Sequence, residues 1–158
     1  VEEHRFKNKY YANENGLNSR LDEIQASILR YKLNKVDEYV KKRRELAKLY
    51  TKKLSSTNLH LPKENKDCKH VYHLFTVFHN QAKKITKKLL KKKIQTRSIY
   101  PYPIHIMKAY SKMIKNQNYL KNSEKKSKGI FSLPLYPELK NSEVNTICNK
   151  LIKILKKI

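Results

Sequence analysis

Cysteine and histidine carry the most reactive side chains of this sequence, and three of them lie close together as Cys68, His70 and His73. Thiolate and imidazole are the ligands that Zn²⁺ prefers. The run KHVYHLFTVFH at 69–79 is rich in residues that favour strands, so residues 70 and 73 are expected on opposite faces of one strand. Side chains on opposite faces cannot hold one ion without a β-bulge, and the spacing therefore argues against a metal site.

Another histidine, His105, ends the segment YPYPIH, which follows a short predicted strand at 96–99. Two prolines restrict the backbone of this segment. A stiff loop beside tyrosines such as Tyr100 is a natural place to present side chains to a ligand. A turn histidine that makes only local hydrogen bonds is the alternative, and the spacing does not choose between the two.

A third candidate site lies in GLNSRLDEIQASIL at 16–29, where Asn18 and Arg20 directly precede an apolar-periodic helix. Ser19 followed by Asp22 resembles a capping box and predicts the start of that helix. Asn18 would either cap the helix or present its amide to an anion at the helix N-terminus. Arg20 would either bind a ligand or pair with a neighbouring carboxylate. The chain has two glycines, and it contains no phosphate-binding or dinucleotide-binding glycine motif.

The formal net charge of +24 raises the question of nucleic-acid binding. Only six of the 37 basic residues are arginines, and the lysines are spread along the whole chain. Base recognition and bidentate phosphate contacts favour arginine. The charge therefore predicts a solvated lysine surface rather than a nucleic-acid-binding protein.

The length of 158 residues suits a single domain, and the sequence begins with Val1, as expected of a fragment or a processed product. No apolar run approaches the roughly 18 residues that a membrane span requires, and the charged first residues do not resemble a signal peptide. Two cysteines without a disulfide framework suit a reducing compartment. These features predict a cytoplasmic protein.

The elements that must position these residues begin with one or two helices over 19–54, where neither Gly nor Pro interrupts an apolar stripe in steps of four and three. Arg43 fills the one gap in this stripe. Such a helix would form a coiled coil or lie across a domain or subunit boundary. The stripe comprises Leu29, Leu33, Val36, Val40, Ala47, Tyr50 and Leu54.

The remainder alternates strands and helices. Gly129 is expected to end one helix as its C′ residue, and Pro134 to place its strand at an edge or end. The order predicts a mixed α/β (α+β) fold in which a small sheet carries packed helices behind the long connecting helix. Helices are expected at 82–93, 106–114, 120–128 and from 142, and strands at 69–79, 96–99 and 130–136.

The quoted motifs resemble those of the DegT/DnrJ/StrS family, the pyridoxal-phosphate-dependent nucleotide-sugar aminotransferases. The stretch at 16–29 is similar to the family's G-x-N-x-R-L-D-E-x-Q-A-A-x-L. Four further stretches resemble family segments in the same order, namely KLNKVDEYVKKRRELAKLYTKKL, HVYHLFTVF, IQTRSIYPYPIHIMKAY and SLPLYPEL.

The resemblance implies the C-terminal part of a fold-type-I enzyme. Residues 1–18 would leave a large domain that is missing here, 19–54 would connect, and 55–158 would form the small domain. The Schiff-base lysine would lie outside this chain, so we expect no catalytic residue within it and no activity of the chain alone. The helix over 19–54 would pack on the large domain and on a second subunit.

The resemblance also implies roles for single residues. Asn18 would reach the phosphate of pyridoxal phosphate in the neighbouring subunit of a homodimer. Tyr100, His105 and Arg20 would bind the nucleotide-sugar substrate, with glutamate as the typical amino donor. No metal, nucleic-acid or membrane partner is implied. A non-catalytic module that completes a partner's active site is the alternative.

The chain departs from the family pattern at three positions. Ile99 stands where a histidine often precedes the tyrosine, Lys93 replaces the usual glycine before Ile94, and Lys121 replaces a common proline. These departures concern substrate details rather than the fold.

Overall fold

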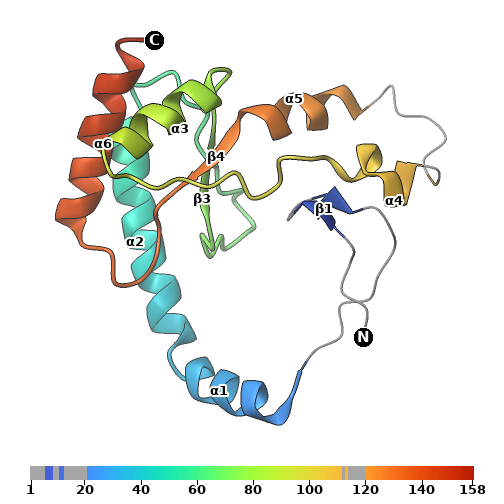
Figure 1. Cartoon of the computed structure of the whole chain (residues 1–158). Helices are drawn as coiled ribbons and strands as arrows, with labels where there is room; N and C mark the ends of the chain where they lie inside the picture. Colours follow the sequence, from blue (N-terminus) through green and yellow to red (C-terminus); the bar gives the residue numbers. More distant parts are fainter. Residues whose placement is uncertain (1–5, 9–10, 13–20, 112, 114–119) are drawn as a thin grey trace.

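A computed structural model describes residues 6–8, 11–12, 21–111, 113 and 120–158 (Figure 1). Two short strands, β1 (Phe6–Asn8) and β2 (Tyr11–Ala12), pair in antiparallel fashion near the N-terminal end. The predicted mixed α/β class is confirmed. Within the described residues, no helix combines the length and the apolar character needed to cross a bilayer.

The predicted helical region consists of two helices, α1 (Glu23–Leu33) and α2 (Val36–Leu54). They are separated at residues 34–35, and Figure 1 shows that they run in different directions. Helix α1 is capped by Asp22, whose carboxylate accepts from the backbone N–H of Gln25 at 2.7 Å. The helix therefore begins later than the capping box predicted at Ser19.

Helix α2 and the C-terminal helix α6 (Asn141–Leu155) pack together to form the centre of the core. One face of the second half of α2 is buried, with Tyr50 and Leu54 fully enclosed. Arg43, the gap in the apolar stripe, donates through Nη1 to the carbonyls of His73 at 3.0 Å and Leu135 at 3.1 Å. The arginine at this position thus supplies hydrogen bonds to backbone carbonyls of two loops.

The small sheet consists of β3 (Phe75–Phe78) and β4 (Ile130–Leu133), paired antiparallel with Phe75 opposite Leu133. Both lie within predicted strands but are shorter, and β4 ends before Pro134 because proline cannot donate to a ladder. The strand predicted at 96–99 is reduced to one bridge between Arg97 and Ser132.

Helix α3 (Ala82–Lys91) packs on α6, and α5 (Lys121–Gly129) packs on α3. Along the chain, the 3₁₀ turn η1 (Ile104–Ile106) and the short helix α4 (Lys108–Ser111) lie between α3 and α5. A single helix over 106–114 was predicted for this region.

The predicted helix does end at Gly129, but this glycine is the last residue of α5 rather than its C′ residue, and its φ is not positive. A Cβ atom at Gly129 would overlap the ring of Phe78. The glycine is therefore required by the close approach of α5 to β3.

Candidate functional site

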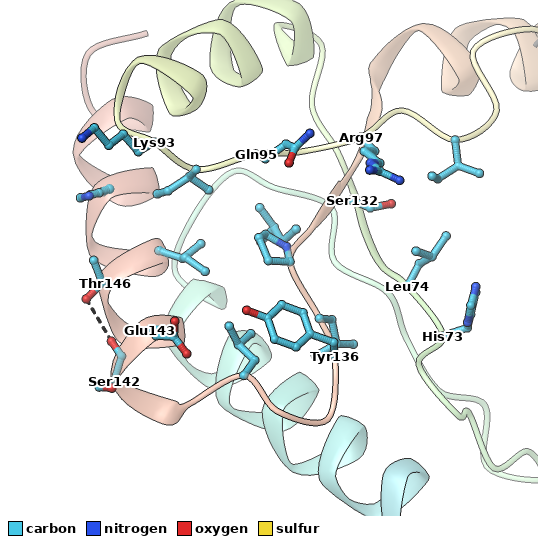
Figure 2. A pocket seen from close by; sticks show the side chains of 18 of the residues that line it. His73, Leu74, Lys93, Gln95, Arg97, Ser132, Tyr136, Ser142, Glu143 and Thr146 are labelled. Carbon is cyan, nitrogen blue, oxygen red and sulfur yellow. Dashed lines mark hydrogen bonds between the residues drawn. The ribbon is translucent and has the colours of Figure 1, made fainter. Parts of the chain in front are cut away.

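An open groove with a volume of about 890 Å³ lies between the segment 93–100, β4 with its continuation to Tyr136, and the first half of α6 (Figure 2). The structure thus brings three distant parts of the sequence to one surface. We call this surface the groove. Its polar lining comprises His73, Lys93, Gln95, Arg97, Tyr100, Ser132, Tyr136, Ser142, Glu143, Thr146 and Lys150.

Side chains of α2 hold the backbone after β4, at Pro134 and Leu135, which forms one side of the groove. The hydroxyl of Tyr50 donates to the carbonyl of Pro134 at 2.9 Å, and Arg43 donates to the next carbonyl, that of Leu135. Burial raises the pKa of the Tyr50 hydroxyl, so the group stays protonated and keeps its donor. Two side chains of one buried helix therefore fix the backbone on which the groove is built.

The upper wall begins at Lys93, which has a left-handed φ of 60°. The N–H of Ile94 returns to the carbonyl of Leu89 at 3.0 Å, which closes the end of α3. Glycine is the usual residue in such a position because it carries no Cβ. This geometry explains the family's glycine at the position of Lys93 and shows that the substitution leaves the turn in place.

Arg97 continues the same wall and is fixed by its own backbone. Its carbonyl accepts from the N–H of Ser132 at 2.8 Å, and its N–H donates to the carbonyl of Ser132 at 3.4 Å. The guanidinium of Arg97 has no protein partner within the part of the chain that the structure describes. Figure 2 shows Arg97 and Ser132 side by side at the groove. A fixed backbone thus carries a cation that is available to a ligand.

The charge of the groove is predominantly positive. Lys93, Arg97 and Lys150 line it, and Glu143 is the one carboxylate among its lining residues. Glu143 is engaged, since it accepts from the backbone N–H of Lys140 at 2.8 Å and so caps α6. Three cations against one engaged carboxylate suit an anionic ligand.

Of the site residues predicted from the sequence, Tyr100 lies in the groove and His105 lies outside it. The side chain of Tyr100 is 71% exposed and lines the groove. His105 is 3% exposed, lies outside the groove lining, and contacts Glu124 of α5 with 3.1 Å between Nε2 and Oε1. Asn18 and Arg20 lie outside the described residues. Their roles remain predictions.

The three cations of the groove were not predicted from the sequence. Lys150 lies on α6 far from the other two, and Lys93 stands among many surface lysines, so no sequence pattern marks either residue. Arg97 offered a signal, because arginine is rare in this lysine-rich chain and here lies three residues before Tyr100 of the YPYPIH segment.

The prediction against a metal site at Cys68, His70 and His73 remains a prediction. Within the described ranges, no three histidine, cysteine or acidic residues are grouped so that they could hold an ion. The Nδ1 atom of His70 instead accepts from the backbone N–H of Tyr72 at 2.8 Å. Cys68 is exposed, and burial raises the pKa of the Cys148 thiol to about 11, which leaves that thiol protonated and unreactive.

Known proteins are similar in sequence to this chain over most of its length. The dTDP-3-amino-3,6-dideoxy-α-D-galactopyranose transaminase of Aneurinibacillus thermoaerophilus is 38% identical over 132 residues, which cover 84% of this chain and 36% of the relative. The GDP-perosamine synthase of Escherichia coli O157:H7 is 31% identical over 146 residues, covering 90% of this chain and 39% of that protein. The chain therefore spans less than half the length of these relatives.

The fold is shared as well. The crystal structure of S. venezuelae DesV, in complex with a ketimine intermediate, superposes with a TM-score of 0.82 at 29% identity, over 98% of this chain and 42% of that one. The sequence model of the DegT/DnrJ/EryC1/StrS aminotransferase family matches residues 2–152. This match covers nearly the whole chain and confirms the resemblance seen in the motifs. The chain belongs to the DegT/DnrJ/EryC1/StrS aminotransferase family.

Proposed function

We propose that the chain acts as the C-terminal part of a cytoplasmic, pyridoxal-phosphate-dependent aminotransferase, and that its groove binds the anionic part of a nucleotide-linked keto-sugar. The observation that carries the proposal is the charge of the groove, three cations against one engaged carboxylate, in a chain of this family. A nucleoside diphosphate is doubly charged or more, and it matches this lining.

The groove residues divide the work of binding. The guanidinium of Arg97, on its fixed backbone, presents a planar pair of donors to one phosphate. Lys93 and Lys150 approach as point charges, and Lys150 is itself oriented because its Nζ donates to the carbonyl of Lys92 at 3.2 Å. The exposed Tyr100 contributes a hydroxyl at the rim. Together these residues bind and orient the substrate while the chemistry takes place beyond this chain.

The cofactor phosphate belongs to a different residue from those that line the groove. The donor set of the groove fits a phosphate-bearing ligand, whereas the residue expected to hold the cofactor phosphate, Asn18, lies outside the described residues. When bound, pyridoxal phosphate supplies the electron sink for amino transfer. We propose that Asn18 holds that phosphate across a homodimer and that glutamate is the amino donor.

The groove is proposed to recognise the phosphates that different nucleotide sugars share. The names of the relatives include a dTDP-sugar and a GDP-sugar. The cations of the groove recognise phosphate, which both nucleotides share, and they do not distinguish one base from the other.

The test is a calorimetric titration of the 158-residue chain with thymidine diphosphate and guanosine diphosphate at fixed salt. We expect binding, and we expect Arg97→Ala to weaken it about tenfold, because hydrogen bonds to charged groups contribute about 1.5–3 kcal/mol. Arg30→Ala is the matched control. Arg30 is exposed on α1, outside the groove lining, and its substitution removes the same charge. Equal weakening by both variants would reduce the groove to non-specific attraction and reject the proposal.

A further inference from the structure

The segment that carries Tyr100 is fastened to the rest of the molecule by very little buried surface. From residue 95 to residue 110, every residue is exposed or half-buried except His105. Its ring is almost completely enclosed, at 3% exposure. A segment with one buried side chain depends strongly on what that side chain contacts.

The segment is not tightly packed on the helices behind it. A cavity of about 470 Å³ separates Pro101, Tyr102 and Pro103 from side chains of α3 and α5. Glu124 and Ser127 of α5 line the opposite wall of this cavity. Because space lies behind residues 101–103, van der Waals packing alone leaves this part of the segment weakly constrained.

The contact of His105 is made with a rigid part of the fold. Its Nε2 lies 3.1 Å from Oε1 of Glu124, which belongs to the first turn of α5. Helix α5 runs directly into β4, and its end is locked where Gly129 meets the ring of Phe78. The pair therefore ties the segment to an element that the core holds in place.

The other end of the segment is fixed independently, by the two backbone hydrogen bonds between Arg97 and Ser132. Tyr100 lies between these two attachments, on the groove side. The carboxylate of Glu124 is the acceptor at one attachment, and a carbonyl of β4 is the acceptor at the other. Loss of the first acceptor would leave a buried ring nitrogen without a partner and weaken the attachment at this end.

We propose that Glu124 is a positioning residue, which acts through His105 to hold the 98–107 segment, and with it Tyr100, at the edge of the groove. The inference deepens the proposed function and rests on it for its purpose, since a positioned Tyr100 serves a ligand in the groove. It also assigns His105 to the support of the segment rather than to direct contact with a substrate.

The first experiment follows backbone amides of the 158-residue chain by NMR. The N–H groups of Ile106 and Met107 are bonded within the turn that carries His105, to the carbonyls of Pro103 at 3.2 Å and Ile104 at 3.0 Å. In Glu124→Ala we expect their hydrogen exchange to accelerate at least about tenfold, while amides of α6 keep their rates. We expect the order parameter of the Tyr100 amide to fall from a rigid value to below about 0.6.

Two further variants separate positioning from general loss of stability. Glu124→Gln keeps an oxygen acceptor at the same reach and is expected to restore slow exchange. Glu45→Ala removes an exposed glutamate from another helix and is expected to change neither measurement. Unchanged exchange at Ile106 and Met107 in Glu124→Ala would overturn the inference. Equal acceleration in α6 would overturn it too, because Glu124 would then support the whole fold.

A titration with thymidine diphosphate distinguishes this inference from the proposed function. We expect Glu124→Ala to weaken binding several-fold and Glu124→Gln to restore it. Faster exchange with unchanged affinity would overturn the positioning role while the groove stands. Absence of binding to the wild-type chain would reject the groove as a nucleotide site, and the exchange rates would still decide whether Glu124 holds the segment.

Discussion

Helices α1 and α2 continue one apolar pattern in the sequence, but the structure buries this pattern in α2 and leaves it exposed in α1. None of the residues of α1 is buried, and Leu29 and Leu33 are 55% and 70% exposed. In α2 the same pattern leads to full burial at Tyr50 and Leu54. The difference teaches that periodicity identifies the face of a helix that can be buried, whereas the chain that covers that face need not be present. For α1 we propose the large domain and the second subunit.

The sharpest test of this contrast removes the same side chain from each helix. Leu54→Ala is expected to destabilise the chain by about 2–5 kcal/mol, because it leaves a cavity in the core. Leu29→Ala, at an exposed position, is expected to change the free energy of unfolding by less than about 0.5 kcal/mol. Urea denaturation of both variants measures the difference. Similar losses would mean that α1 is packed in solution, and the contrast would be lost.

A second test addresses the polar residue within the buried pattern. Arg43→Ala is expected to cost about 1–3 kcal/mol, because the carbonyls of His73 and Leu135 lose a charged donor. Arg43→Lys should recover part of this loss, since an ammonium group cannot match the planar geometry of the guanidinium. Arg30→Ala on exposed α1 serves as the control. If Arg43→Ala and Arg30→Ala cost the same, the two hydrogen bonds contribute little to stability.

The smallest expected effect concerns ion pairs of α2. The hydrogen bond from Arg44 and the backbone N–H of His70 hold the pKa of Glu64 below its usual 4.5. Because the lowered pKa belongs to the folded state, this contribution is present above about pH 4.5 and is lost as the pH falls through the folded value. Glu64→Gln should therefore flatten the decline of stability between pH 5 and pH 3. Denaturation curves across this range measure the slope.

Glu38 provides the matched comparison for Glu64. Lys42 also lowers the pKa of Glu38, but this pair is exposed and lies one turn apart on the same helix. Exposed pairs of this kind contribute little. Glu38→Gln should consequently flatten the acid limb less than Glu64→Gln, and the reverse order would show that tertiary placement of an ion pair does not matter here.

The sequence predicted what local chemistry controls and missed what depends on distant partners. Apolar periodicity located α2, α3 and α6, and proline ended β4 as expected. The reason for Gly129 was misread because Phe78, the ring that requires it, lies on β3, far from α5 in the sequence. The same cause hid the partner of His105, since nothing near it in the sequence indicates Glu124 of α5.

The groove was harder to predict than the fold for the same physical reason. Tyr100 was predicted as a site residue and lines the groove. Lys93 and Arg97 line the groove from the same segment as Tyr100, whereas Lys150 lies on α6, which only folding brings to this surface. Electrostatic complementarity acts through space, and a linear pattern of lysines records their number but not which of them line one surface.

The left-handed turn at Lys93 has a consequence for anyone who engineers this protein. A lysine in that conformation is strained, and glycine would relieve the strain, so a programme that selects thermostable variants or restores the family's usual residue would favour Lys93→Gly. The more stable variant would have an unstrained backbone at residue 93, but the groove would have lost one positive charge. At residue 93, thermal stability therefore favours glycine, whereas affinity for an anion favours lysine.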